Sequence, residues 1–271
     1  RDFIALSAGH SCIEVQNELV TQSYGRGVLG YMADTPLNLL QLANLDRDQC
    51  IDQSVIDHML YIVCNEPSFL NVEAYDAICI SAGSLWEWPA TEGVQGSGFT
   101  NNTTARDAFK KQKGPEWGII GCRYLLHAHC YEMHWTCVAI DLTNKRVIFF
   151  DPYHGQVKRL VSHLDSMVNG LCAYIDSIAI KNAQAYVRVS GLRLWERVWA
   201  QDLKERNGRA IKLPKQETGG EYQLGCALHV IAFAIDLITD THDTLNDEQA
   251  YAMRSWVKLI LTTATVARLT E

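Results

Sequence analysis

The sequence lacks any apolar run near the roughly 20 residues that a membrane-spanning helix requires. It also lacks internal repeats, low-complexity segments and a strongly basic region, since the 271 residues have a formal net charge of -7. The tightest basic cluster is Lys110, Lys111 and Lys113, which is typical of a solvated stretch. We therefore expect neither a membrane nor a nucleic acid among the partners.

Paired CxxC motifs are missing as well, although the chain has 9 cysteines. An odd number of cysteines at irregular spacing, in a chain long enough to bury a core without cross-links, favours reduced thiols. We expect an intracellular protein, cytoplasmic or nuclear. The chain starts at Arg1 without the segments of a secretory signal, so we expect a processed chain or a fragment, from which a targeting segment could have been removed.

Apolar spacing predicts helices that flank a central block of strands. The predicted helices cover residues 51–63, 157–175, 226–238 and 247–268. Short apolar runs predict strands at residues 75–81, 118–126, 135–142, 146–150 and 178–189. Either Asp48 or Asp52 is expected to cap the first helix. The fold class is therefore α+β, with a mixed central sheet flanked by helices.

Two local features refine this expectation. Thr143, Asn144 and Lys145 separate two predicted strands and predict a hairpin turn, which makes those strands antiparallel. Trp195 and Trp199 are four residues apart, the spacing of aromatic side chains on a helix. Residues 81–118 have little periodicity and are predicted to be mainly loop.

A cysteine opens the most apolar predicted helix. Cys226 follows a Gly-containing loop and begins the segment 226–238. A cysteine nucleophile reacts as its thiolate, so its pKa must fall from about 8.5. A helix N-terminus favours that negative charge, and a nearby imidazole can take the proton if a third group orients it. His229, on the same helix, is expected to be a packed histidine and not a second base.

The predicted hairpin offers the other two groups. His134 precedes one of its strands and Asp151 ends the other. In an antiparallel pair the start of one strand lies beside the end of the next, so their separation in sequence is consistent with adjacency. Each residue alone has an ordinary structural explanation, as a packed cysteine, a satisfied histidine or a turn aspartate. Their positions at the edges of strands and helix together favour thiol chemistry.

Three segments of the sequence carry a family likeness: "MHWTCVAIDLTNKRVIFFDPYHG", "LPKQETGGEYQLGCALHVIAFAIDLI" and "CIDQSVIDHMLYIV". The first resembles the His-Trp…Asp block of the Ulp1-like cysteine proteases of clan CE, which include SUMO proteases and adenovirus-type proteases. The second resembles their Pro-x-Gln…Cys block and the third their N-terminal helix. The likeness implies a fold of the Ulp1/adenain type over residues 47–271, with a buried helix opened by the nucleophile. We expect residues 1–46 to form a helical extension.

The resemblance implies a role for each candidate residue. Cys226 would be the nucleophile, His134 the general base and then acid, and Asp151 the orienting carboxylate. A Gln before the Cys donates to the oxyanion in this family, and one such donor contributes about 3 kcal/mol. Gln216 keeps the Pro-x-Gln context, and the N–H of Cys226 would be the second donor. Trp135 would line the substrate channel.

The implied activity is that of a thiol protease or isopeptidase that needs no cofactor. Its substrate would be a protein, either a ubiquitin-like modifier (SUMO-like or other) or another protein, so that processing of such modifiers and deSUMOylation are the implied reactions.

The sequence departs from the family pattern at several positions. The family Gln usually stands six residues before the Cys, where this chain has Gly220, whereas Gln216 lies ten before it and Gln223 three before it. The residue after the Cys is Ala227 and not Gly, and Cys50 replaces an aromatic that helps to roof the channel for a Gly-Gly tail. The triad is therefore compatible with a substrate other than a SUMO-like tail.

Three alternatives stay open. The segment "HAHCYEMHWTC" gathers residue types that bind Zn²⁺, without HExxH or paired CxxC. These are His127, His129, Cys130, His134 and Cys137. The same triad could serve a clan CE acetyltransferase that uses coenzyme A, although this acidic chain shows no cationic cluster for the cofactor's phosphates. The protein could also be a catalytically inactive binding module.

Overall fold

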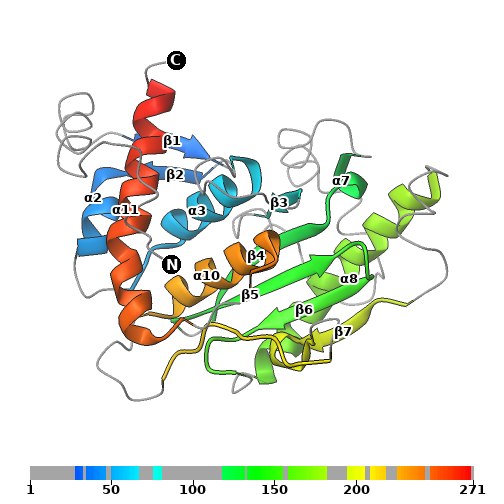
Figure 1. Cartoon of the computed structure of the whole chain (residues 1–271). Helices are drawn as coiled ribbons and strands as arrows, with labels where there is room; N and C mark the ends of the chain where they lie inside the picture. The colour runs from blue at the N-terminus through cyan, green and yellow to red at the C-terminus, as the bar shows by residue number, and fades with distance from the viewer. Residues whose placement is uncertain are drawn as a thin grey trace.

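The computed structural model shows a five-stranded sheet with helices on both faces (Figure 1). The residues that it describes are 28–32, 35–46, 50–66, 76–80, 118–131, 133–154, 158–181, 194–204, 208–217, 225–241 and 245–269. Within these residues, no helix has both the length and the apolar character needed to cross a membrane.

The elements follow one another along the chain as strands and helices in mixed order. The strands are β1 (Val28–Met32), β2 (Thr35–Asn38), β3 (Ala77–Cys79), β4 (Tyr124–Tyr131), β5 (His134–Asp141), β6 (Arg146–Phe150) and β7 (Glu196–Trp199). The helices are α2 (Leu39–Ala43), α3 (Gln53–Asn65), α7 (Gly118–Gly121), α8 (Lys158–Lys181), α10 (Cys226–Thr239) and α11 (Asp247–Leu269). Short 3-10 helices are η1 (Asn44–Asp46) and η3 (Ala200–Asp202).

The central sheet has the order β3-β4-β5-β6-β7. Its two outer pairs, β3 with β4 and β6 with β7, are parallel, whereas β5 pairs antiparallel with both neighbours. The sheet is therefore mixed, which confirms the predicted α+β class.

Helices cover both faces of this sheet, so the central strands β5 and β6 are largely buried on both faces. Successive side chains of a strand point to opposite faces. In β5, Cys137 and Ala139 join the core formed with α3, α10 and α11, whereas Val138 and Ile140 join the core formed with α8. Figure 1 shows α8 on the side of the sheet away from α10. Because helices cover both faces, β5 and β6 are short apolar runs in the sequence and lack a polar alternation.

The predicted helix after residue 225 is the buried centre of the larger core. Every residue from position 226 to 238 is buried in α10. The Phe233 ring of this helix stacks on Phe150 at the end of β6, with ring centroids 4.2 Å apart and an interplanar angle of 8°. This contact joins the carboxyl end of β6 to the middle of α10.

Local polar contacts explain the predicted turn and the predicted cap. The carboxylate of Asp141 accepts hydrogen bonds from the backbone N–H of Asn144, at 3.0 Å, and from its side-chain amide. The β5–β6 hairpin is antiparallel, as predicted. Asp52 caps α3 by accepting from the Ser54 N–H at 2.8 Å, whereas Asp48 lies outside the described residues.

Three predicted elements differ in the structure. The strand predicted at 118–126 begins only at Tyr124, because residues 118–121 form the short helix α7; a short apolar run does not distinguish helix from strand. The strand predicted at 178–189 is wrong for residues 178–181, where α8 continues because Ile178 and Ala179 pack into its core. Trp195 and Trp199 do not share a helix, because residues 196–199 pair with β6 as β7.

The N-terminal region also differs from the helical prediction. Residues 28–38 contain the antiparallel hairpin of β1 and β2, followed by α2 and η1. Leu37, Leu42 and Leu45 are buried in the same core as α3 and α10. Residues 1–27 and the loop predicted at 81–118, apart from Gly118, lie outside the described residues, and the domain division at residue 46 stays a prediction.

Candidate active site

The thiol of Cys226 lies at the N-terminus of α10. The residue is 6% exposed. The N-cap is Gly225, which has no side chain to cap the helix. Its carbonyl accepts from the amides of Leu228 and His229. The first amides of a helix have no partner within the helix, and the dipole there favours negative charge. The sulfur is thus placed where a thiolate is stabilised.

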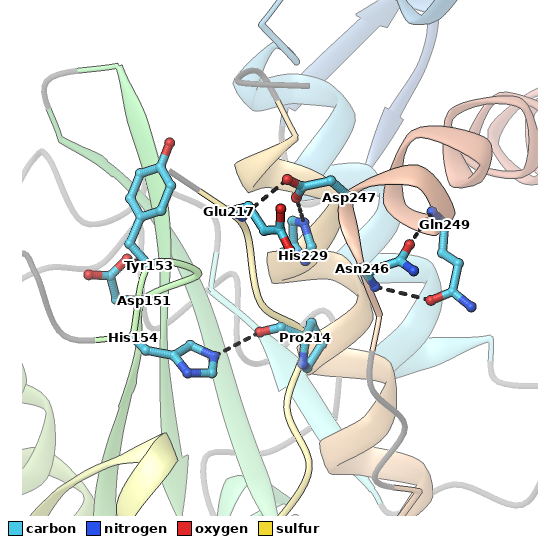
Figure 2. Close-up of polar contacts among 9 residues, drawn as sticks. All are labelled: Asp151, Tyr153, His154, Pro214, Glu217, His229, Asn246, Asp247 and Gln249. Carbon is cyan, nitrogen blue, oxygen red and sulfur yellow. Dashed lines mark hydrogen bonds and ion pairs between the residues drawn. The ribbon is translucent and has the colours of Figure 1, made fainter. Parts of the chain in front are cut away.

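His134 and Asp151 meet at one edge of the β5–β6 hairpin. His134 begins β5, and Asp151 directly follows β6. The Nε2 atom of His134 lies 2.8 Å from Oδ1 of Asp151. The carboxylate is fully buried and also accepts from the backbone N–H of Tyr153 at 2.9 Å. Figure 2 shows Asp151 and Tyr153 on the turn after β6. Both bonds are made to the same oxygen, Oδ1.

The sulfur of Cys226 lies beside this pair. The backbone N–H of Trp135 donates to Sγ of Cys226 at 3.5 Å, and the His134 ring is near enough to Cys226 for the thiol to influence its pKa. Because Nε2 of the ring binds Asp151, Nδ1 is the ring nitrogen left for the thiol. The structure thus brings the three sequence-predicted residues together in the order thiol, imidazole, carboxylate.

The electrostatics of this group favour a protonated imidazole. Burial works against the charged ring of His134, but hydrogen bonds to Asp151 and Cys226, together with their negative charges, raise its pKa to about 9. At neutral pH the ring therefore carries a positive charge next to the sulfur.

The sequence pattern described as "Ulp1 protease family, C-terminal catalytic domain" matches residues 125–266, which include all three residues. The chain belongs to the Ulp1 protease family. It is a cysteine peptidase. No curated protein sequence matches the chain closely enough to serve as a relative.

Solved structures of Ulp1 proteases share the fold over nearly the whole chain. The SUMO protease Ulp1 with its catalytic cysteine oxidised to a sulfenic acid is 14% identical, with 96% of this chain and 98% of that chain covered and a TM-score of 0.60. The C-terminal Ulp1 protease domain in complex with Smt3, the yeast ortholog of SUMO, is 12% identical, with coverages of 93% and 96% and a TM-score of 0.58. The Chaetomium thermophilum Ulp1-like SUMO protease catalytic domain is 12% identical, with coverages of 92% and 88% and a TM-score of 0.53.

An aromatic neighbour of the histidine was not predicted from the sequence. The ring of Tyr153 stacks on His134 with centroids 4.6 Å apart and an interplanar angle of 13°. Tyr153 is two residues after Asp151, so the turn that presents the carboxylate also presents the ring. The only sequence signal is this position, which does not distinguish a stacking partner from an exposed turn residue.

Trp135 and Cys50, the two positions expected at the channel of this Ulp1-family peptidase, both lie near α3. Trp135 is 5% exposed, and its indole N–H donates to the Ile51 carbonyl at 3.2 Å. The pKa of Cys50 is raised, first by burial and then by the charge of Cys226. The pKa of Cys130 is raised by the same two causes. Two further thiols therefore lie within electrostatic range of Cys226. Of these, the sequence placed only Cys50 near the substrate channel.

Gln216 is buried and lies close to the turn that carries Asp151. It is 1% exposed, and its backbone N–H donates to the Pro152 carbonyl at 2.9 Å. The other candidate, Gln223, lies outside the described residues, as does Gly220 at the usual family position. The oxyanion role of Gln216 stays a prediction.

Two histidines of the zinc alternative, His127 and His129, lie on the face of the sheet away from α10. His127 and His129 alternate with Leu126 and Ala128, which join the core of α10, so the two rings belong to the other face of the sheet. Their centroids are 5.8 Å apart. Burial lowers the pKa of His127 to about 3, against a hydrogen bond to the Ile80 carbonyl. Among the described residues, no three potential ligands are grouped to hold a metal ion.

Proposed function

We propose that this peptidase cleaves the peptide or isopeptide bond at the carboxyl end of a ubiquitin-like modifier, with Cys226, His134 and Asp151 as a catalytic triad. The observation that carries the proposal is the 2.8 Å contact between His134 and Asp151 beside a thiol at a helix N-terminus. This arrangement supplies a nucleophile, a base next to it and a group that orients the base.

The proposed cycle follows from these positions. The Cys226 thiolate attacks the scissile carbonyl carbon, and the protonated His134 then gives its proton to the leaving amine as the C–N bond breaks. The resulting thioester is hydrolysed by a water molecule whose proton His134 takes. Asp151 keeps Nε2 of the ring occupied, so that Nδ1 stays directed at the sulfur throughout.

The tetrahedral intermediate carries a negatively charged oxygen that needs donors. The backbone N–H of Cys226 is at the first turn of α10, where amides have no helical partner. Gln216, buried and fastened to Pro152, is the proposed side-chain donor. Each such donor contributes about 3 kcal/mol to stabilising the transition state.

The substrate class rests on the family and on its solved structures. One of these is a complex of the Ulp1 protease domain with Smt3, the yeast ortholog of SUMO, and this chain covers 96% of that protease chain. We propose a protein of the same ubiquitin-like class as the substrate. Trp135 and Cys50 are the proposed wall residues of the channel for its tail, because both lie near Cys226.

A panel of ubiquitin-like proteins with a C-terminal electrophile tests the proposal. Wild-type protein is expected to form a covalent adduct with at least one of them, and peptide mapping is expected to place the adduct on Cys226. Cys226→Ala should form none, whereas Cys130→Ala, which removes a neighbouring thiol, should still react.

An adduct on Cys130 or Cys50 would contradict the assignment of the nucleophile. Absence of any adduct, together with transfer of label from acetyl-coenzyme A to Cys226, would replace proteolysis by acetyl transfer at the same triad.

A further inference from the structure

A second histidine–aspartate pair stands one turn farther along the nucleophile helix. His229 is fully buried in α10, three residues after Cys226. Its Nε2 lies 3.0 Å from Oδ1 of Asp247 (Figure 2). Burial lowers the pKa of His229 although Asp247 opposes this, so the ring is neutral and donates its single proton to the carboxylate. A buried polar pair of this kind fixes the relative position of the two elements that carry it.

Asp247 is not needed to cap its own helix. The cap of α11 is made by Asn246 and Gln249: the Asn246 side chain accepts from the Gln249 N–H at 2.9 Å, and the Gln249 side chain accepts from the Asn246 N–H at 3.0 Å. This reciprocal arrangement satisfies the helix start. Both oxygens of Asp247 are therefore directed to other parts of the chain.

The second oxygen of Asp247 holds the segment that carries Gln216. We call residues 214–217 the strap. The N–H of Glu217 donates to Oδ2 of Asp247 at 3.1 Å, and the N–H of Lys215 donates to the Leu245 carbonyl at 3.2 Å. These two bonds fasten one edge of the strap to the start of α11.

The opposite edge of the strap is fastened to the turn after β6. The Pro214 carbonyl accepts from Nε2 of His154 at 3.2 Å, and the N–H of Gln216 donates to the Pro152 carbonyl at 2.9 Å. Figure 2 shows the strap passing between this turn and the helices α10 and α11. Alternate residues bind to alternate sides, as in a strand between two neighbours. The position of Gln216 therefore depends on both attachments.

We propose that Asp247 is a positioning residue for the oxyanion site, since it joins the strap at Glu217 to His229 on the helix of the nucleophile. Through this link Gln216 keeps a constant place relative to Cys226. The inference rests on the proposed function of Gln216 as the oxyanion donor. The two oxygens of Asp247 bind His229 and the strap, so its effect is on alignment.

The test compares Asp247→Ala with Asn246→Ala, a neighbour that caps α11 but does not bind the strap. Asp247→Ala is expected to lower kcat on a reactive modifier substrate by about 10-fold to 100-fold, because small misplacements of a catalytic group cost this much. KM should stay nearly constant. The rate at which iodoacetamide alkylates Cys226 should also stay constant, since alkylation requires the thiolate but no oxyanion donor. Asn246→Ala should lower the melting temperature while kcat is retained.

Hydrogen exchange gives a second readout that needs no substrate. The Glu217 amide is expected to exchange faster in Asp247→Ala than in the wild type or in Asn246→Ala. Asp247→Asn keeps one acceptor oxygen, so its kcat and its exchange rate at Glu217 should lie between those of the wild type and of Asp247→Ala. This variant decides the question if Asp247→Ala does not fold.

Parallel loss of kcat and of the alkylation rate, or an equal loss of kcat in Asn246→Ala, would overturn the proposal. So would unchanged exchange at Glu217. A wild type that cleaves no modifier would instead contradict the proposed function, while exchange at Glu217 would still decide whether Asp247 holds the strap.

Discussion

Two histidine–aspartate pairs flank Cys226, and they have opposite electrostatic behaviour. His134 and Asp151 are 2.8 Å apart, and His229 and Asp247 are 3.0 Å apart. The pKa of His134 is nevertheless raised to about 9, whereas that of His229 is lowered. Geometry of the pair alone therefore does not decide the charge of the imidazole.

The surroundings of the two rings account for the difference. The His134 side chain keeps 14% of its surface exposed and has the thiol of Cys226 as a second acidic partner. The His229 side chain is 0% exposed, and the neighbouring His154 further lowers its pKa. Desolvation therefore prevails at His229, and the anionic partners prevail at His134. One pair is suited to moving protons, the other to holding chain segments in place.

The largest difference between the two pairs is expected in the activity of variants that replace each histidine. His134→Ala is expected to lower kcat/KM by about 10³-fold or more, because loss of a triad member removes the proton shuttle, and Cys226→Ala should abolish turnover without unfolding the protein. His229→Gln, which retains an N–H for Asp247, should cost less than about 10-fold. Steady-state kinetics, with circular dichroism to verify folding, measures both. Equal losses for the two histidines would contradict the division of roles.

The His134 pair should lose stability as the pH rises. Its pKa is above the ordinary value of 6.5, so its stabilisation is complete below pH 6.5 and is lost as the pH rises through about 9. The difference in pKa corresponds to at most about 3 kcal/mol. Urea unfolding between these pH values should show this decline in the wild type and a smaller one in Asp151→Asn. The same slope in both proteins would show that His134 is not the titrating group.

Thiol reactivity should distinguish Cys226 from its neighbours by roughly 10-fold or more at neutral pH, since thiolate content controls alkylation. The pKa values of Cys50 and Cys130 are raised by burial and by Cys226, so both should react later. His134→Ala should slow alkylation of Cys226, while His229→Gln should leave its rate unchanged. Mass-spectrometric mapping over time measures this order, and uniform labelling of all exposed cysteines would argue against an activated nucleophile.

The His229 pair should show the smallest effect, with the opposite sign. A histidine whose pKa is lowered in the folded state contributes stability above its ordinary pKa of 6.5, and this contribution is lost as the pH falls toward the lowered value. Unfolding measurements between pH 7 and pH 5 should therefore show a decline in stability that is smaller in His229→Gln than in the wild type, because the lowered pKa of His127 contributes to the decline in both proteins. An unchanged decline in that variant would assign the acid sensitivity to other groups.

Much of the fold follows from apolar spacing. The helices α3, α10 and α11 and the hairpin of β5 and β6 were predicted within a few residues, because each has a long apolar pattern or a clear polar turn. Short elements were less predictable. The pair Ile119 and Ile120 suits a strand as well as a helix, and Trp199 ends β7, and does not share a helix with Trp195, only because β6 offers a partner.

The candidate site likewise has residues that the sequence predicts and contacts that it does not. His134, Asp151 and Cys226 could be nominated because hairpin geometry and a helix start are visible in the sequence. The stacking of Tyr153 on His134 and the proximity of Cys130 to the sulfur could not be predicted, since no local pattern in the sequence indicates these contacts.

The sequence by itself determined the class of elements, the antiparallel hairpin and the types of chemical group available, because these depend on the local period of apolar residues and on side-chain chemistry. Only the tertiary structure decided which imidazole is charged and which carboxylate fastens the strap. Those properties depend on desolvation and on charges from distant segments, and packing of α10 between the sheet and α11 sets both.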